Sequence, residues 1–205
     1  NQSFNISGQA NEPGGISFKP DGTEMFISNA YSTPPTTIFK YTLSTAWDIS
    51  SASYASVSQS MTYGLGDFFF KPDGTKIWGC EYSGTPNVYE WTLSTAWDIT
   101  SISLTTTKDV SAQGSGFEGI CWSSDGSYMI IAGDNNKTLD RFAASTAYTL
   151  STATFDQTVS PGASSAPQGV QLKDDDSVLF TADKGGGQFV RQYSVGYAAG
   201  TYPTA

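Results

Sequence analysis

The 205-residue sequence contains no histidine, and this absence excludes several chemistries together. Ser-His-Asp and Cys-His catalysis both use an imidazole as the base, and most catalytic zinc sites use histidine as a ligand. Basic residues are also scarce: ten lysines and arginines stand against 19 aspartates and glutamates, for a net charge of −9. Such a surface repels nucleic acid and anionic lipid, so we expect neither as a partner.

Long apolar runs are missing as well. No stretch approaches the roughly 18 apolar residues that indicate a membrane-spanning helix, so membrane insertion is not expected. The sequence shows no signal peptide, and it begins at Asn1 rather than at methionine. We therefore expect a processed form or an excised part of a longer protein.

Cysteine is rare, and the two that are present, Cys80 and Cys121, form no CxxC pair. Buried free thiols are the main expectation, and one disulfide between neighbouring repeat units is the alternative. The glycine run at residues 185–187 lacks the lysine of a phosphate-binding loop. Residues 173–176 are acidic but lack the spacing of an EF-hand. No cofactor and no bound metal are predicted.

What the sequence does contain is a repeat. The stretch Phe18-Lys19-Pro20-Asp21-Gly22-Thr23 recurs at residues 70–75, in a weaker form at 122–127 and faintly at 172–177. A second phrase, at residues 41–50, recurs at 91–100 and loosely at 142–151. Units of about 50 residues that follow one another in this way share a core with their neighbours, which predicts a single domain.

Each unit is expected to form four antiparallel strands, at residues 15–18, 24–28, 37–43 and 52–58 in the first copy. Proline presets φ for a turn and glycine accepts a positive φ, so Pro-Asp-Gly between two apolar runs predicts a hairpin. In the corner between the third and fourth strands, we expect tryptophan to pack on the outer strands and aspartate to hold the turn. These corner residues are Trp47, Asp48, Trp97 and Asp98.

The second strand of each unit is apolar on both faces, as Met25 with Phe26 and Ile77 with Trp78 illustrate. A strand of this kind lies in a sheet that is packed between two others. Two residues further on, every copy has a small side chain, which indicates close contact between neighbouring sheets. These small residues are Ser28, Cys80, Ala132 and Ala182.

The sequence therefore predicts an all-β fold, a four-bladed β-propeller with four antiparallel strands per blade. One domain covers residues 1–205, with blades at about 15–58, 67–110, 119–158 and 169–195. The last unit lacks its fourth strand, and residues 3–7 resemble that strand, so the N-terminal segment is expected to complete the last blade. The alternatives are a half-ring that pairs with a second copy, and a fragment of a longer ring.

The segment FKPDGTKIW, followed by YEWTLSTAWDITSISL, resembles a tandem repeat of uncharacterised β-propeller proteins from marine bacteria and their phages. That repeat typically reads FKPDGTKMY and YDLSTAWDISTASY. The resemblance covers nearly the whole chain, strongly in the first two units, partly in the third and weakly in the fourth. It implies a propeller in an extracellular or virion-surface setting, and it brings no catalytic residues and no ligand.

In a propeller, the connections after the second and fourth strands gather on one end, and the turns after the first and third strands gather on the other. Here the second end is nearly the same in all copies, whereas the loops of the first end vary. Variable loops on a fixed scaffold are where binding is usually located. The candidate ligand-binding residues on these loops are Tyr31, Tyr63, Tyr82, Phe117, Glu12, Glu81, Glu118, Asp134 and Asp183.

Aromatic rings beside carboxylates are typical of a sugar site. The leading hypothesis is a non-enzymatic module for attachment or assembly, outside the cell or on a virion, that binds a glycan or a surface protein through this end. The second is a purely structural decoration or spacer, with a homo-oligomer left open. A glycoside hydrolase with two carboxylates is a distant alternative, because no spacing singles out a pair. Arg141 and Arg191 are too few for the arginine clamp of a sialidase.

Overall fold

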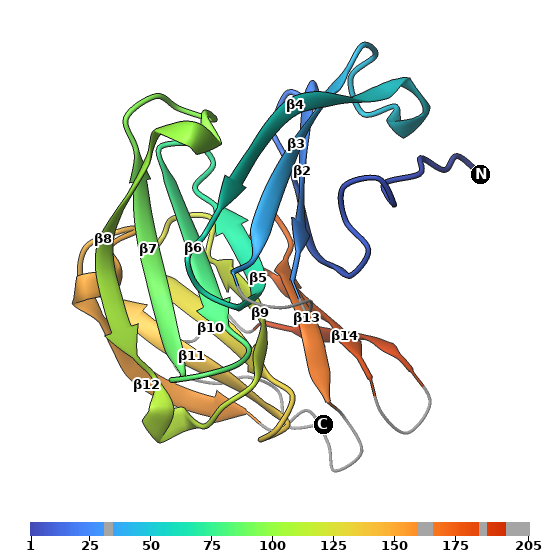
Figure 1. Ribbon diagram of the computed structural model, residues 1–205. Coiled ribbons are helices and arrows are strands. Elements are labelled where there is room, and N and C mark those ends of the chain that lie inside the picture. The colour runs from blue at the N-terminus through green and yellow to red at the C-terminus, as the bar shows by residue number, and fades with distance from the viewer. Residues whose placement is uncertain (31–34, 160–165, 185–187, 196–205) are drawn as a thin grey trace.

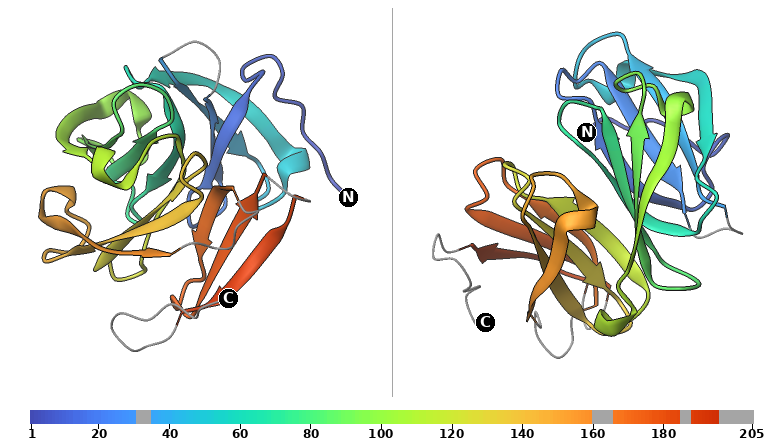
Figure 2. Two further views of the ribbon diagram at one scale, coloured as in Figure 1. Left: turned by 90° about the horizontal axis from the view of Figure 1, so that it is seen from below. Right: turned by 90° about the vertical axis from the view of Figure 1, so that its left-hand side faces the viewer.

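The computed structural model contains four antiparallel sheets arranged about a central axis, which is a four-bladed β-propeller (Figures 1 and 2). It describes residues 1–30, 35–159, 166–184 and 188–195. Blades 1, 2 and 3 each have four strands in chain order, and blade 4 has three within the described residues. The predicted fold class is confirmed.

The strands alternate with short turns and with single turns of 3-10 helix. The strands are β1 (Pro13–Phe18), β2 (Glu24–Asn29), β3 (Thr37–Leu43), β4 (Ala52–Ser60), β5 (Leu65–Phe70), β6 (Lys76–Glu81), β7 (Asn87–Leu93), β8 (Ile102–Asp109), β9 (Phe117–Trp122), β10 (Tyr128–Gly133), β11 (Thr138–Ala144), β12 (Ala153–Val159), β13 (Pro167–Leu172), β14 (Val178–Asp183) and β15 (Val190–Ser194). The 3-10 turns are η1 (Ile49–Ser51), η2 (Ile99–Ser101), η3 (Ser111–Gln113) and η4 (Leu150–Thr152).

The Pro-Asp-Gly turn closes itself through its aspartate. Asp21 Oδ1 accepts a hydrogen bond from the Thr23 backbone N–H at 3.0 Å and another from the Thr23 hydroxyl at 2.6 Å. The hydrogen bonds from Thr23 and from Lys19 hold the pKa of Asp21 at about 2, below its ordinary 3.8. Gly22 has a φ of 72°, a conformation that side chains disfavour. Asp73 and Thr75 form the same pair of hydrogen bonds in blade 2.

The corner tryptophan of each of the first two blades rests on the glycine of this turn. The backbone N–H of Trp47 donates to Gly22 O, and the backbone N–H of Trp97 donates to Gly74 O, both at 3.0 Å. A Cβ on Gly22 would lie 2.4 Å from the indole of Trp47, so only glycine fits beneath the ring. The two repeated phrases therefore form one contact, which explains why they recur together.

The corner tryptophan does not pack on the outer strands, as the sequence suggested. The ring of Trp97 points inward, with its centroid 5.1 Å from that of Phe70 and 6.2 Å from that of Phe26 on the preceding blade. The corner lies at the same end as the hairpin turn, so the larger apolar surface within reach is the inner one. The expected role of the aspartate is confirmed, because Asp98 Oδ1 accepts from the Thr100 N–H at 3.0 Å.

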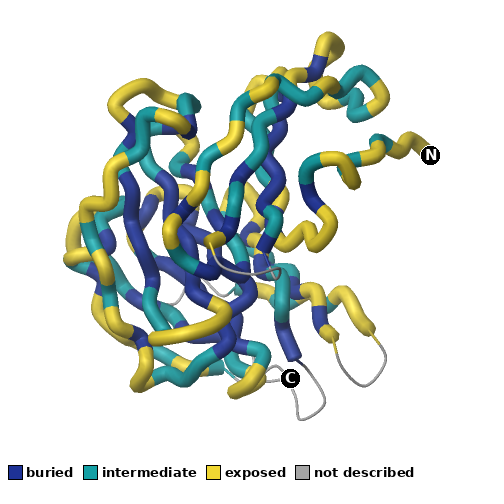
Figure 3. The backbone as a smooth tube through the Cα atoms, in the orientation of Figure 1, coloured by how far each residue is buried: buried dark blue, intermediate teal, exposed yellow. Residues whose placement is uncertain are grey.

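The core of the protein lies between the blades, and the second strands β2, β6 and β10 are buried over most of their length (Figure 3). One cluster joins blade 1 to blade 2, a second joins blade 2 to blade 3, and a third joins blade 3 to blade 4. The two-sided burial of the second strand is confirmed for Met25, Phe26, Ile77 and Trp78.

Residues 3–7 do not form the predicted closing strand, and they do not pair with β15. Phe4 and Ile6 instead pack on blade 1, where the ring of Phe4 meets Tyr41 edge to face at 5.7 Å. Asn5 Oδ1 accepts from the Ser7 N–H at 2.9 Å, and this local hydrogen bond competes with an extended conformation. The prediction that this segment completes blade 4 is therefore wrong for this structure.

Cys80 and Cys121 are buried free thiols, as expected, and the alternative disulfide is absent. Cys80 Sγ donates to the Phe117 carbonyl of the next blade at 3.5 Å, which confirms close contact between sheets at this small position. Among the described residues, no helix is long and apolar enough to span a membrane.

Candidate functional site

Three of the sequence-predicted site residues lie together on blade 2, at the end of the propeller that we call the loop face. Tyr63 stacks on Tyr89 with a centroid distance of 3.8 Å, and the Tyr89 hydroxyl donates to Glu81 Oε2 at 2.6 Å. Tyr82 follows Glu81, and 40% of its surface is exposed. Tyr63 and Glu81 thus make contacts within the blade, and Tyr82 is the most exposed of the three.

The other predicted residues are spread over the remaining blades. Phe117 is fully buried in the core, and the buried carboxylate of Glu118 accepts from the Gln168 amide of blade 4. Asp183 is buried and pairs with Arg191. Asp134 and Glu12 lie at the ends of blades 3 and 1, where their backbone groups hold the loops. Tyr31 lies outside the described residues. The structure therefore does not gather the eight described residues of this set into one site.

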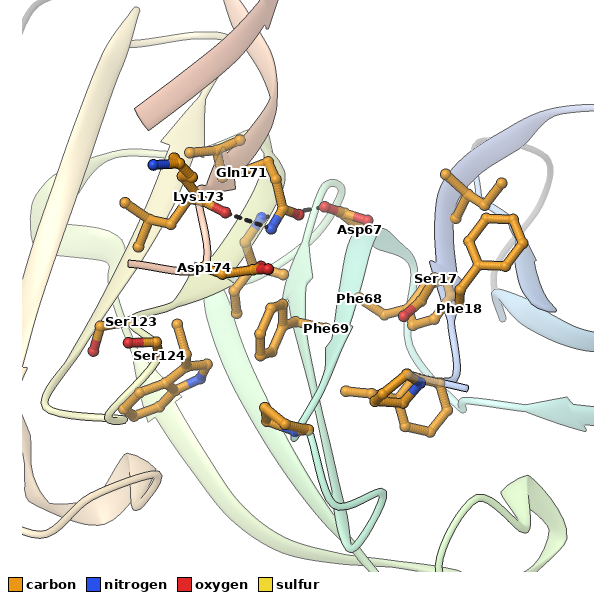
Figure 4. Close-up of a pocket in the computed structure, with 18 of the residues that line it drawn as sticks. Ser17, Phe18, Asp67, Phe68, Phe69, Ser123, Ser124, Gln171, Lys173 and Asp174 are labelled. Atoms are coloured by element: carbon orange, nitrogen blue, oxygen red, sulfur yellow. Dashed lines mark hydrogen bonds between the residues drawn. The ribbon is translucent and has the colours of Figure 1, made fainter. Parts of the chain in front are cut away.

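A cavity of about 690 Å³ lies on the axis and opens at the opposite end, which we call the turn face (Figure 4). The turn face carries the hairpin turns at residues 19–23, 71–75, 123–127 and 173–177. All four blades contribute their inner strands β1, β5, β9 and β13 to the wall. Eight of the lining residues are aromatic: Phe18, Trp47, Phe68, Phe69, Phe70, Trp97, Trp122 and Tyr148.

Asp67 is the carboxylate on the inner wall of this cavity. Its side chain reaches toward blade 1, because a Cβ on Gly15 would lie 2.3 Å from Asp67 Oδ1. On the other side, Asp67 Oδ2 accepts from the Ile120 N–H of blade 3 at 3.3 Å. Burial raises the pKa of Asp67 to about 7, and the backbone N–H groups of Phe68 and Ile120 oppose part of that rise. This carboxyl therefore changes charge near neutral pH.

Polar groups of the turns fix the rim between blades 3 and 4. The Ser124 N–H and hydroxyl both donate to the Asp176 carboxylate, at 2.9 and 2.8 Å. The Tyr148 hydroxyl donates to Ser124 O at 2.6 Å. Gln171 lines the cavity beside them, and its amide donates to Leu172 O at 2.9 Å. This side of the rim is held by hydrogen bonds rather than by apolar packing alone.

Sequence reasoning missed Asp67, although an alignment of the four repeats shows that this position is unusual. The positions equivalent to Asp67 are Gly15, Gly119 and Gly169, so one repeat places a carboxyl where the others place glycine. Glycine at these positions lets the inner strands approach one another, and a Cβ on Gly119 would lie 2.7 Å from Gln168 O. No group of three or more possible metal ligands occurs in the described part of the chain.

The fold is similar to several larger solved structures. The periplasmic gluconolactonase of Pseudomonas aeruginosa is 15% identical, with a TM-score of 0.64, over 94% of this chain and 56% of that chain. A protein of unknown function from Desulfotomaculum acetoxidans is 13% identical, with a TM-score of 0.61, over 94% and 55%. A putative 6-phosphogluconolactonase from Bacteroides uniformis is 14% identical, with a TM-score of 0.61, over 92% and 54%.

At these identities the similarity shows the fold alone, and this chain spans about half the length of the structures that it matches. Neither a protein-family model nor a curated protein sequence matches the chain. The comparisons therefore place this chain among β-propellers and leave its function to the chemistry of its own residues.

Proposed function

We propose that the chain is a non-enzymatic binding module that takes the end of a glycan in its axial cavity. The observation that supports this proposal is an aromatic-walled cavity of about 690 Å³, with the carboxyl of Asp67 on its inner wall and those of Asp174 and Asp176 in the turn at its rim. Ligand sites are typically concave, about 300–1,000 Å³ in volume and mostly apolar, with a few polar groups that orient the ligand. Both the size and the lining of the cavity fit that description.

A sugar suits this lining because its C–H faces are apolar and its edges carry hydroxyl groups. The partly exposed rings of Phe69 and Tyr148 offer surfaces for the faces, and Asp67 and Gln171 offer acceptors and donors for the hydroxyls. The rim between blades 3 and 4 is already fixed by hydrogen bonds, so binding orders few new side chains there. Attachment outside the cell or on a virion is the setting that the repeat resemblance implies.

The loop face offers less to a sugar than the sequence suggested. Tyr63, Glu81 and Glu118 are engaged in contacts within or between blades, and Phe117 is fully buried. A ligand at that end would have to displace these contacts before it gained new ones. We therefore assign the proposed glycan site to the turn face.

The test compares the two ends in a glycan-array screen, followed by calorimetry with a sugar that binds. Asp67→Asn and Gln171→Ala are expected to weaken binding by about tenfold each, which corresponds to about 1.4 kcal/mol. Tyr82→Ala, an exposed aromatic on the loop face, is the control and should leave the affinity unchanged. Loss of binding in Tyr82→Ala alone would move the site to the loop face, and no binding to any sugar would reject the proposal.

A second candidate function is hydrolysis of a sugar lactone, and Asp67 is the observation that favours it. A carboxyl with a pKa of about 7 can accept a proton from water near neutral pH. Water would attack the lactone carbonyl while Asp67 takes its proton. As the bond between the carbonyl carbon and the ring oxygen breaks, Asp67 would return that proton to the ring oxygen, which becomes the hydroxyl of the open acid. The test is hydrolysis of gluconolactone above the spontaneous rate, with loss of that activity in Asp67→Asn.

A further inference from the structure

Each blade presents two faces to its neighbours. We call the face toward the next blade in the chain the trailing face, and on blade 1 this face carries Phe26 and Ile38. The leading face is the opposite one, which carries the corner tryptophan. On blades 1, 2 and 3 the trailing side chains are all buried, at 4% exposure or less. These side chains are Phe26, Ile38, Trp78, Val88, Ile130 and Leu139.

The trailing face of blade 4 is different. Val190 is equivalent to Ile38, Val88 and Leu139, yet 78% of its surface is exposed. Phe180, in the position of Trp78, is only partly buried. The cluster that buries this face in the other blades has no counterpart on blade 4 within the described residues. Blade 4 therefore ends in an apolar sheet face that no other blade covers.

The leading face of blade 1 shows the matching difference. Trp97 of blade 2 lies against Phe26 of blade 1, and Tyr148 of blade 3 lies 6.0 Å from Trp78 of blade 2. Trp47 occupies the same corner of blade 1, where it contacts Phe18 of its own blade, and 60% of its surface is exposed. The two exposed faces are thus the two halves of the contact that is made three times elsewhere in the chain.

The N-terminal segment lies where a preceding blade would place its fourth strand. Val57, in β4, packs against the cluster of blade 2 that contains Trp91. Ile6 packs against the cluster of blade 1 that contains Tyr41, the equivalent of Trp91. In the described part of the chain, β15 has β14 as its one strand partner, whereas β3, β7 and β11 each have two. A segment in the place of a fourth strand and a third strand that lacks one therefore lie on opposite sides of one seam.

We propose that two copies of this chain close one ring. The trailing face of blade 4 in each copy packs on the leading face of blade 1 in the other, and residues 3–7 of that second copy pair with β15. A head-to-tail contact between identical chains can close into a ring. The four blades of one chain are packed at three interfaces and are open at the seam between blades 4 and 1, so two chains joined at their seams give a ring of eight blades.

The first experiment is light scattering coupled to size exclusion over a range of concentrations. The expected mass is twice the 21.8 kDa of one chain. Val190→Asp should halve the mass, because the charge would be buried in the seam. Leu104→Asp, at a residue of β8 that is 44% exposed, is the control and should leave the mass unchanged. A single-chain mass for the unmodified protein, or a mass that grows without limit, would overturn the proposal.

The second experiment traps the seam with cysteines. Thr42 and Ser53 are opposite each other in β3 and β4, with their hydroxyls 3.1 Å apart, and their equivalents across the seam are Ser194 and Ser3. One chain with Ser3→Cys is mixed with another with Ser194→Cys and oxidised. A covalent heterodimer is expected, with none when either variant is oxidised alone. In the double variant, a cross-link within one chain would show that the ring closes without a second copy and would overturn the inference.

Discussion

Trp97 and Trp47 have the same neighbours in sequence, the same φ of 64° and the same hydrogen bond to a turn glycine. Their surroundings nevertheless differ. Trp97 lies between Phe70 and Phe26 and is partly buried, whereas Trp47 rests on Phe18 and is 60% exposed. The local motif therefore builds the corner in both blades, and only the presence of a preceding blade decides whether the corner contributes to a core.

This difference separates two kinds of stability in the molecule. Among the described residues, the hairpin-turn contact within a blade occurs four times and the corner contact three times, because each depends on a short sequence phrase. Contacts between blades are made three times, and they bury most of the large apolar side chains. The seam between blades 4 and 1 has the residues for a fourth such contact but not the packing. Variants at equivalent positions on the packed interfaces and on the seam measure that difference directly.

The largest difference is expected at the centre of the trailing face. Trp78 is fully buried, and its indole N–H donates to Glu90 Oε2 at 2.9 Å, while the equivalent Phe180 is partly exposed. Trp78→Ala should lower the free energy of unfolding by about 3–5 kcal/mol. Phe180→Ala should cost less than half as much in the single chain. Urea unfolding of both variants, at concentrations where the mass is that of one chain, checks this, and equal costs would contradict an open seam.

Asp67 is expected to give the next largest effect, because it lies where the inner strands of three packed blades meet. The unfolded chain has an aspartate pKa near 3.8, and burial raises the folded value to about 7. The folded chain therefore binds this proton more tightly, and stability should be full below about pH 4 and fall as the pH rises toward 7.

Each pKa unit of that rise corresponds to about 1.4 kcal/mol of folding free energy, and solvent in the cavity reduces the total effect on stability. Asp67→Asn should remove the decline between pH 4 and 7, which urea unfolding at a series of pH values would show. An unchanged slope in this variant would mean that another group titrates. Asp21→Asn is the control, because the pKa of Asp21 lies near 2, below the pH range in question.

A matched pair of valines sharpens the same comparison at smaller scale. Val88 is fully buried between blades 2 and 3, and Val190 is 78% exposed at the equivalent position of blade 4. Val88→Ala should cost about 2 kcal/mol, from the loss of two buried methyl groups and the space they leave. Val190→Ala should cost less than about 0.5 kcal/mol in the single chain. A similar cost at both sites would show that the seam is packed in solution.

The smallest difference is expected at the turn glycines. Gly22 and Gly74 both have a positive φ, and an added Cβ would lie within 2.4 Å of the indole above each. Substitution by alanine should lower the free energy of unfolding by about 1 kcal/mol at either site, because a residue with a Cβ disfavours a positive φ. Gly74→Ala should cost more in total, because Phe26 and Phe70 hold Trp97 in place, whereas the exposed Trp47 is free to move aside. Thermal unfolding of the two variants would rank them, and the reverse order would contradict this account.

The sequence by itself determined the blade. The Pro-Asp-Gly turn, the Trp-Asp corner and the two-sided apolar second strand depend on residues close together in the chain, and their spacing gave the number of strands and blades. The third strand of the first blade was predicted at residues 37–43, where β3 is found. The burial of Cys80 also followed from sequence, because small side chains recur at its position and those of blades 1, 2 and 3 are buried between sheets.

Tertiary structure decided what happens at the axis and at the seam. Residues 3–7 have the pattern of a fourth strand, but their apolar side chains are buried on blade 1, so pattern alone gave the wrong partner. The predicted site residues share one end of the propeller, but several of them use their polar groups and rings to hold the blades. The cavity and the raised pKa of Asp67 arise where strands distant in sequence converge. Burial at such a point depends on several blades at once, and the residues near Asp67 in the chain do not encode it.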